Sequence, residues 1–288
     1  MSDWIQGDKF QKLANYTYAP PTVNAYDYAR IKNTLDVKSL KDGDIIYCVG
    51  FDYYKRQLLE IIKDTKKVIL ISHNCDYCID DSYAIPDNVV KWYSINVNTD
   101  NPKVESIPTG LQNNIWFTGL LQPNPMDKID KMVQKLNGPK NIKNLVYMDH
   151  RIYPNPKVRK VPYDILGNKS FVTSYVPDEK DKAEAGEFCR YLDNVYNHKF
   201  VICPAGNGIS THRPWEVLYM GSIPIEIRCI NNSYFNDLPI CLVDSWEEVT
   251  EHFLTNWLIE NHNRKWNWDK LSFSFWKNKI FNMQKECR

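Results

Sequence analysis

The chain has 288 residues, of which 43% are hydrophobic and 25% are charged, as is ordinary for a globular protein. This length suits one large domain or two compact ones. Its 36 basic and 35 acidic residues nearly cancel, which excludes a nucleic-acid binder that works by broad phosphate neutralisation. We therefore expect no nucleic-acid partner.

The sequence predicts neither a secretory signal peptide nor a membrane-spanning segment. It opens without a basic segment followed by an apolar run, and no stretch approaches the ~20 apolar residues that span a bilayer. We expect no membrane span and a cytoplasmic location, or a fragment cut from a longer protein. Cys75 and Cys78 have CxxC spacing, but no second such pair accompanies them, so a zinc site or a redox motif is the less favoured alternative.

The first half of the chain changes character after residue 40. Residues 1–40 are rich in Tyr and Pro and show no periodicity, which predicts an irregular arm. Alternating strands and helices begin thereafter. We predict strands at 44–49, 67–72, 92–96 and 104–107, and helices at 53–63 and 127–136. The sequence Asn-Gly-Pro-Lys-Asn at 137–141 ends the last helix and predicts an interdomain linker.

A second alternating series follows the linker. Strands are predicted at 145–148, 171–173, 200–203, 223–227 and 240–243, with helices at 157–166, 178–194, 210–220 and 245–253. Pro162 counts against an unbroken helix at 157–166. Ser245 and Glu248 form a capping-box pattern for the last helix. The remaining tail is helical and aromatic, and its rings must lie on something to be buried.

Strands that alternate with helices predict mainly parallel sheets covered on both faces. We therefore predict an α/β protein of two doubly wound, Rossmann-like domains with a cleft between them and a C-terminal helical tail. The domains would span 1–138 and 142–255, and the tail at 256–288 would pack back on the N-terminal domain. A single large α/β domain with an irregular arm is the alternative.

The segment at 199–227 is the most informative part of the sequence. It predicts a strand, a glycine-rich turn, a helix and a second strand, an order that gathers free N–H groups at a helix N-terminus and suits phosphate. Gly206 and Gly208 would allow a close backbone approach and positive φ. Arg213 and Glu216 share a helix face, where Arg213 suits phosphates and Glu216 suits sugar hydroxyls. A surface ion pair on an ordinary crossover is the alternative.

This region resembles the exostosin-like glycosyltransferases of GT-B architecture. The matching patterns are F-x-x-x-P-x-G at 200–206, S-x-x-R-x-x-E at 210–216 and G-x-I-P at 221–224. The blocks ESIPTGLQNNIW at 105–116 and ISHNCDY at 71–77 are similar to exostosin-like proteins of viruses and microbes. The resemblance extends over roughly residues 44–255. Glu226 departs from it, because that strand is usually apolar in the family.

The resemblance implies an inverting hexosyl- or pentosyltransferase that moves a sugar from a UDP-sugar to a hydroxyl of an oligosaccharide or glycoprotein acceptor. The C-terminal domain would hold the donor and the N-terminal domain the acceptor. A fixed cation replaces a metal on the leaving group, so no metal or other cofactor is expected. In its size and general character the chain resembles a viral or microbial xylosyltransferase. If the enzyme is viral, we expect it to be located in the cytoplasm of the host cell. A non-catalytic glycan- or nucleotide-binding protein of the same fold is the alternative.

The resemblance also assigns roles to residues. Arg213 would neutralise the diphosphate leaving group and Glu216 would bind the ribose. The other donor-binding residues would be Gly206, Asn207, Gly208, Ser210 and Thr211 in the turn. Asp149, His150 and Arg151 follow the first strand of the second domain and are expected to face the donor phosphates, with a polar turn as the alternative.

Inverting transfer needs a general base. Asp76 is the first candidate, since it follows a strand of the N-terminal domain. His73 is the second candidate, and Asp80 or Asp81 is the third. A turn or capping role is the alternative for Asp76.

Overall fold

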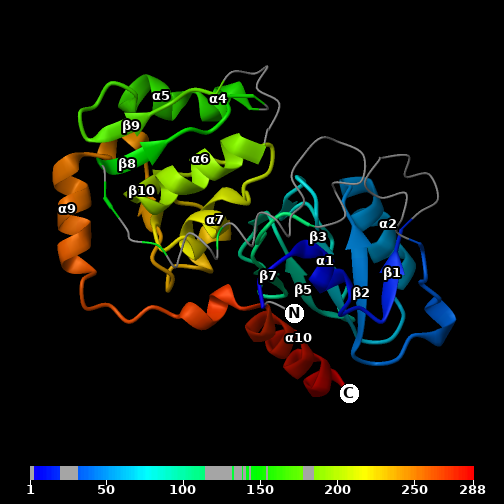
Figure 1. Cartoon of the computed structure of the whole chain (residues 1–288). Coiled ribbons are helices and arrows are strands. Elements are labelled where there is room, and N and C mark those ends of the chain that lie inside the picture. Colours follow the sequence, from blue (N-terminus) through cyan, green and yellow to red (C-terminus); the bar gives the residue numbers. More distant parts are fainter. Residues whose placement is uncertain are drawn as a thin grey trace.

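The computed structural model describes residues 3–19, 32–113, 132, 138, 141–142, 144–153, 155–177 and 185–288. These residues form two five-stranded sheets and one two-stranded sheet, all parallel. Figure 1 shows the two large sheets in separate halves of the molecule. The predicted α/β class with two Rossmann-like parallel sheets is confirmed. The domain boundaries and the cleft between the domains stay predictions.

The strands of the first sheet follow the chain from one edge to the other. In order they are β1 (Tyr16–Tyr18), β2 (Asp44–Val49), β3 (Val68–His73), β5 (Val89–Ser94) and β7 (Val104–Ser106). Helix α2 (Asp52–Ile62) connects β2 to β3 and buries Leu58, Leu59 and Ile62 against one face. Alternate residues of β2 and β3 enter two different apolar clusters, as the two-residue period of a strand requires. Short strands β4 (Ile79–Asp80) and β6 (Val97–Asn98) form the two-stranded sheet.

The prediction of an irregular arm at 1–40 is wrong for its described residues 3–19. They contain helix α1 (Gly7–Gln11) as well as β1, and Ile5 and Phe10 are completely buried. Both elements are too short to show a periodicity. Their stability comes from tertiary contacts, such as the pairing of β1 with β2.

In the second sheet, later strands are added first on one side of the starting strand and then on the other. Its spatial order is β12 (Cys241–Val243), β11 (Ile223–Ile227), β10 (His198–Ile202), β8 (Asn144–Met148) and β9 (Val172–Ser174). The chain moves from β8 outward to β9, then returns past β8 to add β10, β11 and β12 on the other side. Strands β8 and β10 are neighbours whose connections leave in opposite directions, which makes the space between their ends a topological switch point.

Helices cover both faces of the second sheet. Apolar side chains of α6 (Ala185–Tyr196) and α7 (Arg213–Tyr219) pack on one face, and those of α5 (Val161–Leu166) and α9 (Glu251–Glu260) pack on the other. Helix α4 (Pro156–Arg159) precedes α5, whereas α8 (Ile230–Ser233) contacts the first half, where Asn231 accepts a hydrogen bond from the Val97 N–H of β6. The helix predicted at 157–166 is two helices, and Pro162 lies in the first turn of α5, where its missing N–H leaves no bond unmade. The Ser245–Glu248 capping box is present, but it caps a 3₁₀ turn, and α9 begins only after Thr250.

Part of the predicted connection between the halves lies outside the described residues. This applies to the helix at 127–136 except Met132, which is buried, and to the linker except Gly138 and Asn141. It also applies to 178–184 of the helix predicted at 178–194.

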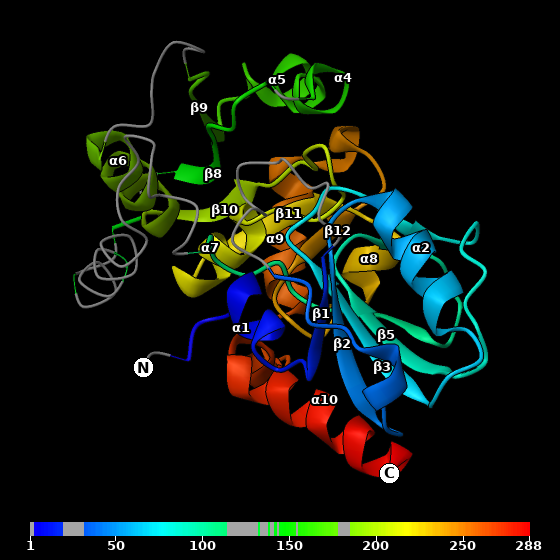
Figure 2. The same cartoon turned by 90° about the vertical axis from the view of Figure 1, so that its right-hand side faces the viewer.

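The chain returns to the first half at its C-terminal end. Helix α10 (Phe273–Cys287) lies beside the first sheet (Figure 2), where Gln284 donates a hydrogen bond to the Gly43 carbonyl (2.9 Å). Trp276 and Ile280 of α10 belong to one apolar cluster that includes side chains of both large sheets. The two halves therefore share a core. No helix in the described ranges is long and apolar enough to cross a membrane.

Candidate functional site

The switch point of the second sheet is where this topology places a ligand, beyond the carboxyl ends of the strands. Asp149 and His150 directly follow β8, and the turn at 203–208 directly follows β10. Helix α7 brings Arg213 to the same edge, where it pairs with Asp149. The structure thus brings together Arg213, His150 and the glycine turn, which the sequence predicts to be separate parts of one site.

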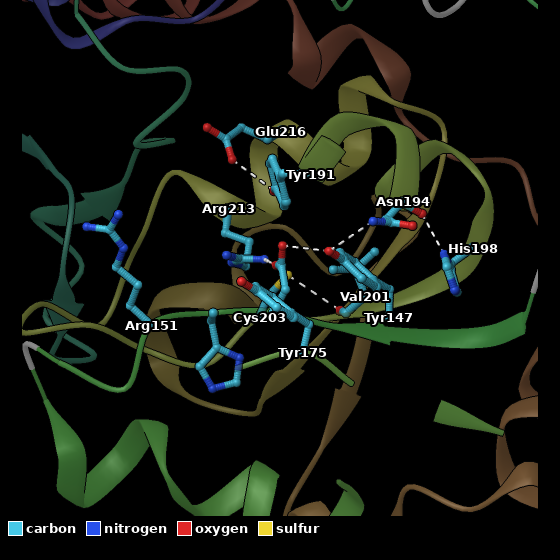
Figure 3. Close-up of polar contacts among 12 residues, drawn as sticks. Tyr147, Arg151, Tyr175, Tyr191, Asn194, His198, Val201, Cys203, Arg213 and Glu216 are labelled. Carbon is cyan, nitrogen blue, oxygen red and sulfur yellow. Dashed lines mark hydrogen bonds and ion pairs between the residues drawn. The ribbon is translucent and has the colours of Figure 1, made fainter. Parts of the chain in front are cut away.

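Arg213 is held in place by a chain of buried contacts. Its Nη1 lies 2.7 Å from Oδ1 of Asp149, whose Oδ2 accepts a 2.7 Å hydrogen bond from the Tyr147 hydroxyl. The guanidinium also lies over the ring of Tyr191, 4.8 Å from its centroid (Figure 3). Burial opposes the charge, but Tyr191 and Asp149 outweigh it, so the pKa of Arg213 is raised well above its ordinary value. The result is a fixed, permanent cation.

Glu216 lies nearly one helical turn after Arg213 and is half-buried. Its Oε2 accepts a hydrogen bond from the Tyr191 hydroxyl at 2.9 Å (Figure 3). The ion pair of Arg213 is with Asp149. The alternative of a surface Arg213–Glu216 pair is therefore not what the structure shows.

Arg159 is a second cation at this edge, and sequence reasoning missed it. Its Nη1 donates to the Ala205 carbonyl at 3.2 Å, and Asn155 donates to the Gly206 carbonyl at 2.9 Å. Burial and then the charge of Arg213 lower the pKa of Arg159 to about 10, so it stays charged at neutral pH. No motif marks Arg159, because only the path of the chain around β8 brings α4 beside the glycine turn.

The glycine turn differs from its prediction in two ways. Gly206 and Gly208 do not adopt positive φ, and the Gly206 N–H donates to the Gly208 carbonyl at 3.0 Å. Gly208 is needed for space: a Cβ there would lie 2.8 Å from Nδ2 of Asn96. Asn207 at the tip of the turn is exposed.

The helix after the turn is also shorter than predicted. It begins at Arg213 rather than at residue 210 and has seven residues. The Ser210 N–H donates to Oδ1 of Asn96 at 2.7 Å, and the Ser210 hydroxyl bonds to Thr109. The N–H and the hydroxyl of Ser210 are thus both engaged with the first half of the chain. Its predicted part in a phosphate cradle, like that of half-buried Thr211, stays a prediction.

His150 and Arg151 differ in their surroundings. His150 is completely buried, and its pKa is lowered to about 3 by burial and then by the charge of Arg213. Arg151 is exposed, and its carbonyl accepts a hydrogen bond from Arg159. Figure 3 shows the Arg151 side chain apart from Arg213. The expectation that the two residues face the donor phosphates stays a prediction.

Of the base candidates, His73 is the most enclosed. It is 1% exposed, it donates from Nε2 to the Pro108 carbonyl (3.0 Å), and its Nδ1 accepts the Asn74 N–H (2.8 Å). Burial lowers its pKa to about 4. Both ring nitrogens are engaged, and the ring stacks on Phe10 at 5.3 Å. These contacts favour a structural role for His73.

Of the carboxylate candidates, Asp76 lies on the loop between β3 and β4, Asp80 is the last residue of β4, and Asp81 follows that strand. Asp76 is exposed in the turn itself. Asp80 accepts hydrogen bonds from Ser82, and Asp81 accepts one from Thr99. Asp76 and Asp81 are both exposed, whereas Asp80 is half-buried.

Asn96 connects the two regions and is a second residue that sequence reasoning missed. Its Nδ2 donates to the Cys75 carbonyl at 2.7 Å, while its Oδ1 accepts the Ser210 N–H. A single amide therefore holds the turn that carries Asp76 beside the glycine turn. Asn96 has a φ of 57°, a conformation that asparagine tolerates better than most residues. Only that backbone geometry, which no sequence pattern shows, would have identified it.

No group of three or more His, Cys, Asp and Glu side chains in the described part of the chain could hold a metal ion. Cys75 and Cys78 form no disulfide. The ammonium of buried Lys55 lies 3.4 Å from Sγ of Cys75 and 3.1 Å from the Tyr77 carbonyl. The CxxC pair is therefore packed as part of the loop.

Comparison with known proteins adds a distant structural likeness. No family model matches the sequence, and no curated protein matches it. Among solved structures the chain is similar to the crystal structure of an alpha1,3-fucosyltransferase, with 13% sequence identity and a TM-score of 0.43. The match covers 83% of this chain and 78% of that chain. At this level it carries no information on substrate or mechanism.

Proposed function

We propose that this protein is a glycosyltransferase that takes a sugar from a nucleotide diphosphate donor and transfers it to a hydroxyl of a glycan acceptor. The observation that carries the proposal is the pair of fixed guanidinium groups, Arg213 and Arg159, at the switch point of the second sheet. Two cations suit a diphosphate, and planar guanidiniums match phosphate oxygens well. The sequence patterns at 200–224 favour the same activity.

The proposed reaction is a direct displacement with inversion. Asp76 removes the proton of the acceptor hydroxyl, whose oxygen attacks the anomeric carbon while the bond to the diphosphate breaks. The negative charge that develops on the departing diphosphate is stabilised by Arg213 and Arg159. The hydrogen bonds of Asn96 support these two roles, because they connect the turn that carries the proposed base, Asp76, to the glycine turn beside the two arginines.

The donor assignments remain part of the proposal. UDP is the proposed nucleotide, with Glu216 on the ribose and the glycine turn near the diphosphate. Because the fixed cations supply the charge that a metal would otherwise supply, we propose that transfer needs no metal ion. Full turnover in the presence of a chelator is the expected result.

Nucleotide binding tests the proposal first. Calorimetry with UDP, GDP and CMP should show binding of a nucleoside diphosphate. Binding of none of them would refute a nucleotide-dependent transferase. Binding of UDP with neither transfer nor hydrolysis of any UDP-sugar would instead support the alternative, a non-catalytic binding protein.

Arg213→Lys tests the leaving-group role. Lysine keeps a charge but loses the planar fork, so turnover should fall by roughly 10²–10³-fold while the fold persists. Arg228→Lys is the matched control, since Arg228 pairs with Asp244 on the surface. Circular dichroism should show both variants folded. Turnover near the wild-type rate in Arg213→Lys would refute the role.

A further inference from the structure

His150 has one ring nitrogen that is left without a partner. Its Nδ1 is the one buried side-chain nitrogen or oxygen, among the residues that the structure describes, for which there is no hydrogen bond. The ring is completely buried and packs against Tyr163, with centroids 4.5 Å apart. Buried polar atoms are almost always paired, because an unpaired one loses its bonds to water without replacement. This nitrogen therefore calls for a partner that is supplied from outside the chain.

The other nitrogen of the ring determines what that partner must be. Nε2 lies 2.7 Å from the carbonyl oxygen of Arg159, which can only accept, so Nε2 carries the hydrogen. Burial and the neighbouring charge of Arg213, with a smaller effect of Arg159, lower the pKa of His150 to about 3. The ring is consequently neutral at neutral pH. Nδ1 then presents a lone pair and needs a hydrogen-bond donor.

A lone pair at this place cannot bind the phosphates themselves. Phosphate oxygens of a diphosphate are ionised at neutral pH and act as acceptors. The guanidinium groups of Arg213 and Arg159 are close enough to lower the pKa of His150. These two groups are the ones that would hold the diphosphate. The chemical groups that flank a diphosphate in a nucleotide-sugar are the ribose and the transferred sugar, and both carry hydroxyls.

We propose that Nδ1 of His150 accepts a hydrogen bond from a hydroxyl of the ribose or of the transferred sugar of the donor. This inference rests on the proposed function and replaces the expectation that His150 faces the phosphates. His150 thereby becomes a specificity residue that selects hydroxyl-bearing donors. A binding site that leaves such an acceptor unpaired discriminates strongly against an analogue without the hydroxyl.

Deoxy analogues test the inference on the wild-type protein. Calorimetry would compare UDP with its 2′-deoxy and 3′-deoxy analogues, which probe the ribose, and with UDP-glucose and its deoxy-sugar analogues, which probe the transferred sugar. We expect loss of one hydroxyl to weaken binding about tenfold, the size of one hydrogen bond to a buried partner. The ¹⁵N resonance of His150 Nδ1 should shift when the intact donor binds.

Two substitutions separate the two ring nitrogens. His150→Gln places an amide nitrogen near Nε2, so it keeps a donor for the Arg159 carbonyl but loses the acceptor at Nδ1. His150→Asn keeps an oxygen near Nδ1. The Gln variant should bind the sensitive deoxy analogue and its parent equally, while the Asn variant should retain part of the difference.

The outcomes separate the two proposals. If a nucleoside diphosphate binds but every deoxy analogue binds like its parent and the Nδ1 resonance does not move, the inference is overturned and the proposed function stands. The inference is also overturned if His150→Gln discriminates as the wild type does. If no nucleoside diphosphate or nucleotide-sugar binds at all, the proposed function fails and the inference fails with it. The wild-type measurements decide the question even if a variant does not fold.

Discussion

Single residues decide how closely the two halves of the site approach each other. Asn96 ends the strand region of β5 in the left-handed conformation and is completely buried. Its amide bonds to one turn from each half of the chain. A residue held in a sparsely populated conformation persists only when its surroundings determine it, and such residues gather at functional sites. Asn96 thus helps to fix the turn of Asp76 relative to the glycine turn, together with the contacts of Thr109 with Ser210 and of His212 with the Gly110 carbonyl.

Asp76→Asn tests the proposed base. The amide cannot accept a proton, so turnover should fall by roughly 10²–10⁴-fold, while UDP should bind as before because the donor groups are unchanged. Steady-state kinetics and calorimetry measure the two quantities.

Asp81→Asn is the control for that substitution, since it removes the same charge from an exposed position on the other side of β4. It should leave turnover within about twofold of the wild type. If Asp76→Asn retained wild-type turnover, the base would have to be assigned elsewhere. A large loss in Asp81→Asn would point to that residue.

At the level of secondary-structure elements, the glycine turn after β10 requires glycine at position 208 because a larger side chain has no space there, and not because the backbone has a positive φ. Gly208→Ala would drive a Cβ into the amide of Asn96, whereas a Cβ on Gly206 would first meet Cγ2 of Thr211 at 3.4 Å. We expect Gly208→Ala to lower the free energy of unfolding by about 1–3 kcal/mol, because Asn96 must give up bonds to both turns. Gly206→Ala should change it by less than about 0.5 kcal/mol. Urea unfolding compares the two, and equal losses would contradict the assigned contact.

Glu226 puts a carboxyl group in strand β11, where it predicts a pH-dependent stability. Glu226 as a whole is half-buried, and the loss of water around its carboxyl group raises its pKa from 4.5 to about 8. Between these values the folded protein keeps the proton and the unfolded chain releases it. Stability should therefore fall as pH rises from about 4.5 to about 8 and then level off.

Thermal unfolding of Glu226→Gln measures that effect. The variant should gain stability relative to the wild type as pH increases from 5 to 8, because it has no charge to bury. Glu247→Gln, at an exposed position, should follow the wild type. Parallel unfolding temperatures for wild type and Glu226→Gln over this range would contradict the raised pKa.

On the scale of the whole molecule, the two chain ends join the halves. Near the N-terminus, the Ile5 N–H donates to the Tyr219 hydroxyl, and the same hydroxyl donates to the Leu271 carbonyl. The Phe273 N–H donates to the Asp3 carbonyl, which fastens the start of α10 to the first residues of the described chain. One apolar cluster then extends through both sheets. We expect the two halves to unfold together.

Trp276→Ala tests that cooperation. Removing this fully buried ring from the shared cluster should cost about 3–5 kcal/mol and lower a single unfolding transition. Lys277→Ala, on the exposed side of α10, is the matched control and should have little effect. Urea unfolding followed by both tryptophan fluorescence and far-ultraviolet circular dichroism would show whether the transitions coincide. Two separate transitions in the wild type would contradict a shared core.

How much the sequence revealed differed between elements. Strands β2, β3, β10 and β11 could be predicted because each contains a short cluster of apolar residues bounded by turn signals. β1 and α1 could not, because three- and five-residue elements carry no periodicity. In the site, Arg213 was marked by its spacing to Glu216 and the glycine turn. Arg159 and Asn96 had no such mark, since their partners are distant in sequence.

Local periodicity and turn chemistry specify elements and their order, so the α/β class, the parallel sheets and the place of a candidate anion site after β10 follow from the amino-acid sequence. Which side chains meet follows only from the packing of the folded chain. The reversal of strand order put Arg159 and His150 beside Arg213, and Asn96 joined the glycine turn to the turn of Asp76. These contacts depend on how distant segments pack, and no local pattern records that.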